Sequence, residues 1–393
     1  RGFLYFPPKQ NLFQKALEAS FSGTRFRLSI NRFRAIQNQN LRDSIFSQMY
    51  RLVHRKPPSE LRQSDQIWTI TFEGESGIDA GGLWRESLTQ LVQDLESDAC
   101  RMFIPCPNNR ENYGRIGRDK FLPNPKFKSA SFRQQFCFIG KVMGISLRQG
   151  MPLQFNLPNM VWKLVVGEEP NEGDIAEIDE HLMKFNQTLL QIDETNFKEE
   201  INLYFTLPNS IGEEVPLIEG GKNIKVTWNN RKEYVNSCIS FRLQESVEAC
   251  AAMRAGLGTI IPLNYLNLWT GEELQLQVCG KPGFDVALLR RHTSFQHFNE
   301  NSNMARWIFR ALSSFSATER ERFLQFAWGR SRLPIGERGW THSFTPCRGT
   351  GGDEAMPHAH TCFFTIDFPI YSSYAVLRKR LYTAMTYSGI MTD

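Results

Sequence analysis

The chain has 393 residues, enough for two or three cores of ordinary domain size, and its 41% hydrophobic and 12% aromatic content is typical of a well-packed protein. Lysine and arginine exceed aspartate and glutamate by only 46 − 41 = 5, and no basic run resembles a nucleic-acid-binding stripe, so we expect no nucleic acid partner. No apolar stretch approaches the roughly 18 residues that span a bilayer, so we expect no membrane insertion.

The first residues and the cysteines indicate what kind of protein the chain comes from and in which compartment it works. Residues 1–8 lack the pattern of a signal peptide and there is no initiating Met, so we expect a piece of a longer protein. The eight cysteines form no CxxC pair and no regular framework, which is typical of reduced thiols in a cytoplasmic or nuclear protein. Most of them should be small core hydrophobes.

Residues 68–205 alternate between strand and helix signals. Apolar and polar residues alternate over 68–73, which predicts a strand, and after a glycine-rich turn a helix begins at Leu83. Two apolar helices are predicted over 132–147 and 157–166, and the acidic stretch 168–205 is also helical in pattern.

Residues 206–257 predict two further elements. A hairpin is expected over 206–228, with its turn at 219–223. Arg231 to Leu257 predicts one long helix that ends among glycines.

The clearest boundary is at residues 279–283. Gly280, Pro282 and Gly283 interrupt regular structure and give the backbone the freedom of a hinge. Beyond it, an amphipathic helix over 304–315, a capped helix beginning at Ser316, a strand over 364–368 and a closing helix over 376–385 predict a compact α+β unit of about 110 residues.

The segment 356–371 carries the candidate chemistry. Cys362 follows a Pro/Gly-rich loop, His360 lies two residues before it, and Asp367 lies on the strand behind it. A free thiol is only about 3% thiolate at neutral pH, so a nucleophile here would need help from a nearby base or dipole.

The residue types alone leave three interpretations of this segment open. Cys362 could be a buried strand cysteine, a nucleophile, or part of a metal site with His358, His360 and Cys347, because alternate residues of an extended chain share one face. The metal site is disfavoured because CxxC and HxxxH spacings are absent, so we expect no metal.

A resemblance favours the nucleophile. Met356-Pro357, His360-Thr361-Cys362-Phe363 and Asp367-Phe368-Pro369-Ile370-Tyr371 resemble the active-site signature of HECT-type ubiquitin ligases. Further family-like motifs lie in the family's order at 72–83, 121–125, 136–141, 222–235 and 324–334. The resemblance covers residues from about 28 to the end.

The resemblance implies an α+β, bilobal fold. A large, mainly helical N-lobe would span 28–280 and bind a ubiquitin-conjugating enzyme within about 168–257, after an N-terminal extension of residues 1–27. A hinge at 281–284 would lead to a smaller α/β C-lobe over 285–393. The flexible segment placed above on backbone grounds coincides with that hinge.

The resemblance also implies roles. Cys362 would accept ubiquitin as a thioester from the conjugating enzyme and pass it to a substrate lysine, without a cofactor. Thr361 and His360 would shape the loop or assist proton transfer, and Asp367 would orient or deprotonate the lysine. The alternative for His360 is a hydrogen bond that braces the loop, and the alternative for Asp367 is a place on a solvated strand face. Tyr234 matches an aromatic position that contacts the conjugating enzyme in the family. Its alternative role is packing in the core beside its helix.

Two positions depart from the family pattern, and two other functions stay open. Ile390 stands where many members have a Phe that assists transfer, and Met356 replaces a Leu. The alternatives are a catalytically silent binding module of the ubiquitin pathway and a cysteine hydrolase that uses Cys362 with His360.

Overall fold

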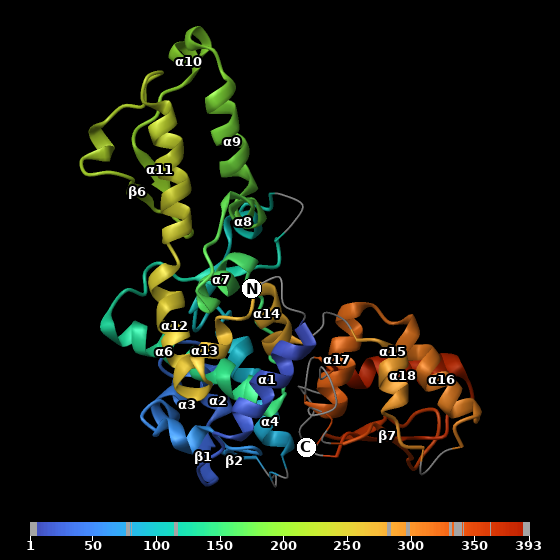
Figure 1. The fold of residues 1–393 in the computed structure, drawn as a ribbon. Helices are drawn as coiled ribbons and strands as arrows, with labels where there is room; N and C mark the ends of the chain where they lie inside the picture. The colour runs from blue at the N-terminus through green and yellow to red at the C-terminus, as the bar shows by residue number, and fades with distance from the viewer. Residues whose placement is uncertain are drawn as a thin grey trace.

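A computed structural model describes the fold, and it covers residues 6–75, 79, 81–113, 117–280, 284–295, 299–329, 332–333, 340, 342–361 and 363–387. Buried apolar side chains form three clusters, which define three parts of the molecule. We call them the base (residues 6–166 and 247–280), the arm (172–244) and the C-terminal unit (284–387). Figure 1 shows the arm extending away from the base and the C-terminal unit lying to one side of it.

The base combines helices with two small sheets, in which β1 pairs with β2 in parallel and β3 pairs with β4 antiparallel. Its elements are α1 (Phe6–Glu18), β1 (Phe26–Ile30), α2 (Arg32–Asn38), α3 (Ile45–Val53), η1 (Pro58–Leu61), β2 (Trp68–Phe72), α4 (Gly82–Asp94), β3 (Phe103–Pro105), α5 (Pro107–Arg110), β4 (Phe121–Pro123), α6 (Ala130–Gln149), α7 (Asn159–Val166), α12 (Val247–Ile260), α13 (Leu263–Leu266) and α14 (Gly271–Cys279). The predicted strand at 68–73 and the helices that follow it are confirmed.

Helices α6 and α12 form the centre of the base and cross at very short range. A Cβ at Gly140 would lie 1.8 Å from the carbonyl oxygen of Met253, and one at Gly256 would lie 1.7 Å from that of Cys137. Only glycine fits at such backbone contacts. These two glycines therefore set the separation of the two helices.

The N-terminal residues belong to the base. Phe13 and Leu17 of α1 are buried in its cluster, and Lys9, 2% exposed, pairs with Glu273 of α14 at 2.9 Å. Residues 6–27 were predicted to be an extension, but they form part of this core. The burial of α1 depends on partners that are about 250 residues away in the sequence.

The arm contains four helices and one antiparallel hairpin, β5–β6. Its elements are α8 (Glu172–Ile178), α9 (Glu180–Gln191), α10 (Glu194–Glu200), β5 (Thr206–Pro208), β6 (Glu214–Pro216), η2 (Gly221–Asn223) and α11 (Arg231–Gln244). The predicted hairpin turn at 219–223 was wrong: the strands turn at 209–213, where the side chain of Asn209 accepts from the amides of Ile211 and Glu213, and 221–223 forms a short 3-10 helix.

The predicted single helix from Arg231 to Leu257 was also wrong, because the chain breaks into α11 and α12 at Glu245 and Ser246. The carboxylate of Glu245 accepts hydrogen bonds from the amide (2.8 Å) and hydroxyl (2.5 Å) of Ser210 and pairs with Arg242 at 2.8 Å. These contacts fix the break where arm and base meet, and they depend on a loop 35 residues away.

The C-terminal unit packs its helices on a three-stranded sheet of order β7-β9-β8. Its elements are α15 (Val286–Arg291), α16 (Asn303–Ser314), α17 (Ala317–Trp328), β7 (Thr345–Arg348), β8 (His358–His360), β9 (Thr365–Phe368) and α18 (Tyr374–Tyr387). The predicted capping box of Ser316 and Glu319 is present at the start of α17. The mixture of helices with small sheets agrees with the α+β prediction. No helix in the part of the chain that the model covers is long and apolar enough to span a membrane.

Candidate functional site

Strand β9 divides its residues between the core and the surface. Ile366 and Phe368 are fully buried against the helices, while Thr365 and Asp367 point to the opposite face. Opposite residues in a sheet share a face, so His358, which pairs with Asp367, also lies on the outer face. The sheet thus presents a polar surface on a fully packed core.

The predicted site residues His360 and Asp367 meet on this surface. His360 Nε2 lies 2.8 Å from Asp367 Oδ2, and their side chains are 42% and 37% exposed. The ring of His358 contacts that of His360 edge to face, with centroids 4.8 Å apart. A hydrogen-bonded His–Asp pair fixes the ring orientation and can accept or relay a proton.

Cys362 lies outside the described residues, but its neighbours on both sides are described. The amide of Phe363 donates to the carbonyl of His360 at 3.0 Å. Phe364 has a φ of +53°, uncommon for a residue with a side chain, and its buried ring stacks on Trp328 of α17 at 4.1 Å. This stacking holds the residues that follow Cys362 against the core.

Thr361 connects the site to the base. Its carbonyl accepts a hydrogen bond from the guanidinium of Arg85 on α4 at 3.3 Å. A second contact joins the hydroxyl of Thr89, one turn further along α4, to the carbonyl of Gly329 at 3.2 Å. The segment before Cys362 and the end of α17 therefore both face α4.

The other seven cysteines are poor nucleophiles. Burial is the main cause that raises the pKa of every one of them, to about 11 for Cys238 and Cys279. The seven are Cys100, Cys106, Cys137, Cys238, Cys250, Cys279 and Cys347. For Cys347, which is half-buried, the nearby Asp367 carboxylate raises the pKa further. Because the thiolate is the reactive form, none of these seven thiols suits nucleophilic chemistry at neutral pH.

The predicted hinge is described only at its first residue. Gly280 has φ 75° and ψ 175°, a conformation that essentially only glycine adopts. A Cβ there would lie 3.0 Å from Pro152 Cβ and 3.3 Å from Arg332 Cβ. Pro282 and Gly283 lie outside the described residues, so the hinge stays a prediction.

Tyr234 is part of the arm's core. It is 3% exposed, its ring meets Phe205 edge to face at 5.6 Å, and its hydroxyl donates to the carbonyl of Thr206 at 3.2 Å. Burial raises the pKa of its phenol. Its predicted contact with a conjugating enzyme stays a prediction, and in this structure the ring serves core packing.

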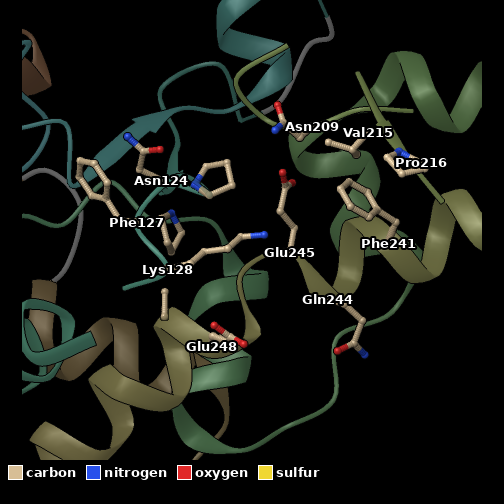
Figure 2. Close-up of a pocket in the computed structure, with 13 residues that line it drawn as sticks. Asn124, Phe127, Lys128, Asn209, Val215, Pro216, Phe241, Gln244, Glu245 and Glu248 are labelled. Carbon is tan, nitrogen blue, oxygen red and sulfur yellow. The ribbon is translucent and has the colours of Figure 1, made fainter. Parts of the chain in front are cut away.

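The pocket in Figure 2 lies between arm and base and not at the Cys362 loop. It has a volume of about 400 Å³, and Lys128, Glu245 and Glu248 face it along with apolar side chains such as Phe127 and Phe241. No sequence pattern predicted it, because its walls come from three separate segments, at 123–128, 209–216 and 241–249.

Comparison with known proteins decides the family. The model of the HECT-domain (ubiquitin-transferase) family matches residues 89–392. The chain belongs to the HECT family. The match covers the arm, the C-terminal unit and most of the base, so the HECT fold accounts for most of the chain.

Among curated relatives, the HECT chain is 30% identical to the E3 ubiquitin-protein ligase HERC2 of Mus musculus, with 100% of this chain and 8% of the relative covered. It is 28% identical to E3 ubiquitin-protein ligase TOM1-like of Neurospora crassa (98% and 9%) and 31% identical to E3 ubiquitin-protein ligase ptr1 of Schizosaccharomyces pombe (88% and 11%). The chain thus spans about a tenth of the length of these relatives.

Proposed function

We propose that this HECT chain is the catalytic module of a ubiquitin-protein ligase that carries ubiquitin as a thioester on Cys362. The observation that carries the proposal is that Cys362 stands in the family-like sequence His360-Thr361-Cys362-Phe363, whereas burial disfavours ionisation of the other seven thiols. The partners would be a ubiquitin-conjugating enzyme, ubiquitin and protein substrates, in the cytoplasm or nucleus.

The reaction has two acyl transfers. The Cys362 thiolate attacks the thioester carbonyl of ubiquitin on the conjugating enzyme, a new thioester forms, and the enzyme's thiolate leaves. A substrate lysine amine then attacks the Cys362 thioester, an amide forms, and the Cys362 thiolate leaves. The amine must lose a proton in the second step, and the His360–Asp367 pair is placed two and five residues from Cys362 to accept it.

Exchange between two thioesters changes the free energy little, so the main task is positioning. Holding two reactants in line can lower a barrier by about 7–11 kcal/mol. The conjugating enzyme would dock within about 168–257, largely on the arm. A hinge at Gly280, Pro282 and Gly283 would let the Cys362 sulfur approach the conjugating enzyme in the first step and the substrate lysine in the second. Thr361 would set the loop through its carbonyl contact with Arg85.

The test compares the wild type with Cys362→Ser and Cys362→Ala after mixing with ubiquitin-loaded conjugating enzyme. We expect a reductant-sensitive ubiquitin adduct on the wild type, a reductant-resistant ester on Cys362→Ser and none on Cys362→Ala. Cys347→Ser, which changes a half-buried thiol on strand β7, is the matched control and should keep the reductant-sensitive adduct.

Other outcomes separate the rival functions. An adduct on Cys362→Ala would overturn the proposal. A wild type that binds the conjugating enzyme but forms no adduct with any of a panel of them would favour the silent binding module. Labelling of Cys362 by a ubiquitin-derived electrophile, with hydrolysis of ubiquitin esters and no conjugating enzyme present, would favour the hydrolase.

A further inference from the structure

The outer face of the C-terminal sheet brings together two imidazoles and a carboxylate. His358 and His360 lie on the same face of β8, and Asp367 of β9 is the direct partner of His358 in the sheet. One ligand atom from each of the three residues lies within 4.8 Å of the other two. The cluster is exposed at the surface, so an ion in solution can reach it.

We propose that His358, His360 and Asp367 form a binding site for Zn²⁺, and that its occupation blocks ubiquitin transfer from Cys362. The metal site stands on the cluster alone, whereas the effect on transfer rests on the function proposed above. The sequence predicted no metal here, and the set that it considered contained Cys347 and Cys362 in place of Asp367.

The donor set suits zinc. Imidazole nitrogen and carboxylate oxygen bind Zn²⁺ at about 2.0–2.2 Å, and three protein ligands with one open position are a common arrangement. Tetrahedral geometry at these bond lengths puts the ligand atoms about 3.3–3.5 Å apart. His360 Nε2 and Asp367 Oδ2 lie 2.8 Å apart, and rotation of the exposed side chains can bring all three ligand atoms to the required separation.

His358 is the residue that the His360–Asp367 pair does not explain. Its side chain is exposed and makes no hydrogen bond or ion pair with any residue that the structure describes, and its ring meets that of His360. A His–Asp pair needs no second imidazole, whereas a metal site needs a third ligand. Two ordered strands hold all three residues, which favours a defined geometry over a chance encounter.

Bound Zn²⁺ would affect ubiquitin transfer through two of its ligands. A bound Zn²⁺ uses the lone pairs of His360 and Asp367, so neither can accept a proton from an incoming lysine. His360 is two residues from Cys362, which limits their Cα separation to about 7 Å. The ion would therefore sit close to the thioester while changing no oxidation state.

The first experiment measures binding on the whole chain without any conjugating enzyme. We expect one Zn²⁺ per chain in calorimetric titration, and weak visible bands of a nitrogen- and oxygen-ligated ion when Co²⁺ replaces it. His358→Asn should weaken binding at least about tenfold, because even outer-shell partners change metal affinity 10- to 100-fold.

The matched control is His181→Asn. His181 is a 63% exposed histidine 3.7 Å from the carboxylate of Glu111, so it offers an imidazole beside an acid outside the cluster. Its substitution should leave the affinity unchanged. Equal affinity of His358→Asn and the wild type, or a thiolate-to-cobalt charge-transfer band, would overturn the assignment of these three ligands.

The second experiment measures discharge of the Cys362 thioester onto free lysine in the presence of increasing Zn²⁺. We expect inhibition of the wild type, and a midpoint at least about tenfold higher for His358→Asn, with similar discharge of both without metal. Metal binding that depends on His358 but leaves discharge unchanged would overturn the inhibitory role. Absence of any thioester without metal would instead count against the proposed function, and the binding experiment would still decide the site.

Discussion

Two junctions join the base to the rest of the molecule, and they use different kinds of contact. At the end of the arm that leads into the base, Arg242 is 3% exposed and pairs with both Asp179 and Glu245 at 2.8 Å. The two carboxylates are equally buried, and Glu245 also accepts two hydrogen bonds from Ser210. This network of buried charges fixes the end of the arm, at the break between α11 and the base helix α12.

The junction of the base with the C-terminal unit contains separate hydrogen bonds. Arg85 donates to the Thr361 carbonyl at 3.3 Å, and Thr89 donates to a carbonyl of the C-terminal unit at 3.2 Å. Gln154 donates to Glu321 at 3.5 Å. Each such bond contributes about 0.5–1.5 kcal/mol and can form again after it breaks.

The two kinds of contact differ in how readily they allow a part of the molecule to change its position. A buried ion network loses several kcal/mol when one member is removed, so it holds a single arrangement. Independent hydrogen bonds between groups that water can also satisfy allow more than one arrangement. We therefore expect the end of the arm to keep one arrangement, and the C-terminal unit to be the part that can change its position.

The largest expected effect on the free energy of unfolding comes from a substitution in the arm. Arg242→Met leaves two buried carboxylates without their cation, so we expect the free energy of unfolding to fall by about 3–5 kcal/mol, measured by urea denaturation. Lys198→Met, which removes a 67% exposed partner of Glu194 on α10, is the control and should cost no more than about 1 kcal/mol. Equal effects of the two substitutions would show that the arm junction does not depend on its charges.

A smaller effect is expected at the other junction from Gly280→Ala. The backbone conformation there and the 3.3 Å approach to Arg332 Cβ of the C-terminal unit disfavour any Cβ, at a cost of about 1–3 kcal/mol. Undocking of the C-terminal unit would relieve this strain, so we expect solution X-ray scattering to show a more extended molecule. Gly220→Ala, at a similar φ of +70° but in open space, should leave the scattering profile unchanged. A profile for Gly280→Ala that matches the wild type would contradict the proposed mobility.

The smallest effect is a dependence on pH through Glu321. Burial raises the pKa of this carboxyl, although the guanidinium of Arg332 at 3.8 Å opposes the shift. The folded state therefore keeps the proton at pH values where the unfolded chain has lost it, so stability falls as pH rises from the ordinary glutamate pKa through the folded one, and then levels off.

Glu321→Gln removes this titration. The stability of the variant relative to the wild type should increase across the same pH window, measured by urea denaturation at pH values from about 4 to 7. A difference between the two proteins that does not change with pH would show that Arg332 cancels the effect of burial.

Local patterns predicted the elements that depend on local contacts. The helix over 304–315, the capping box at Ser316 and the strand at 365–368 were all predictable, because periodicity and caps act within a few residues. The motif around Cys362 was predictable from the resemblance, although Cys362 itself lies outside the described residues.

Features that depend on distant partners were missed. The break at Glu245 needs Ser210, and the burial of Phe13 needs Trp269, whose ring lies 4.5 Å away. The partnership of His358 with Asp367 needs the register of β8 with β9, which no spacing in the sequence reveals. Candidate ligands that share a sheet face can be proposed from sequence only within one strand.

The stacking of Phe364 on Trp328 has a consequence for how the two parts of the molecule communicate. Trp328 ends α17, and the carbonyl of the next residue, Gly329, is the one that binds Thr89 on the base. The end of α17 thus makes both the contact that holds Phe364 and a hydrogen bond to the base. A change in the contact with Thr89 would therefore reach Phe364 through one aromatic ring, so docking of the C-terminal unit and the position of Phe364 are linked through α17.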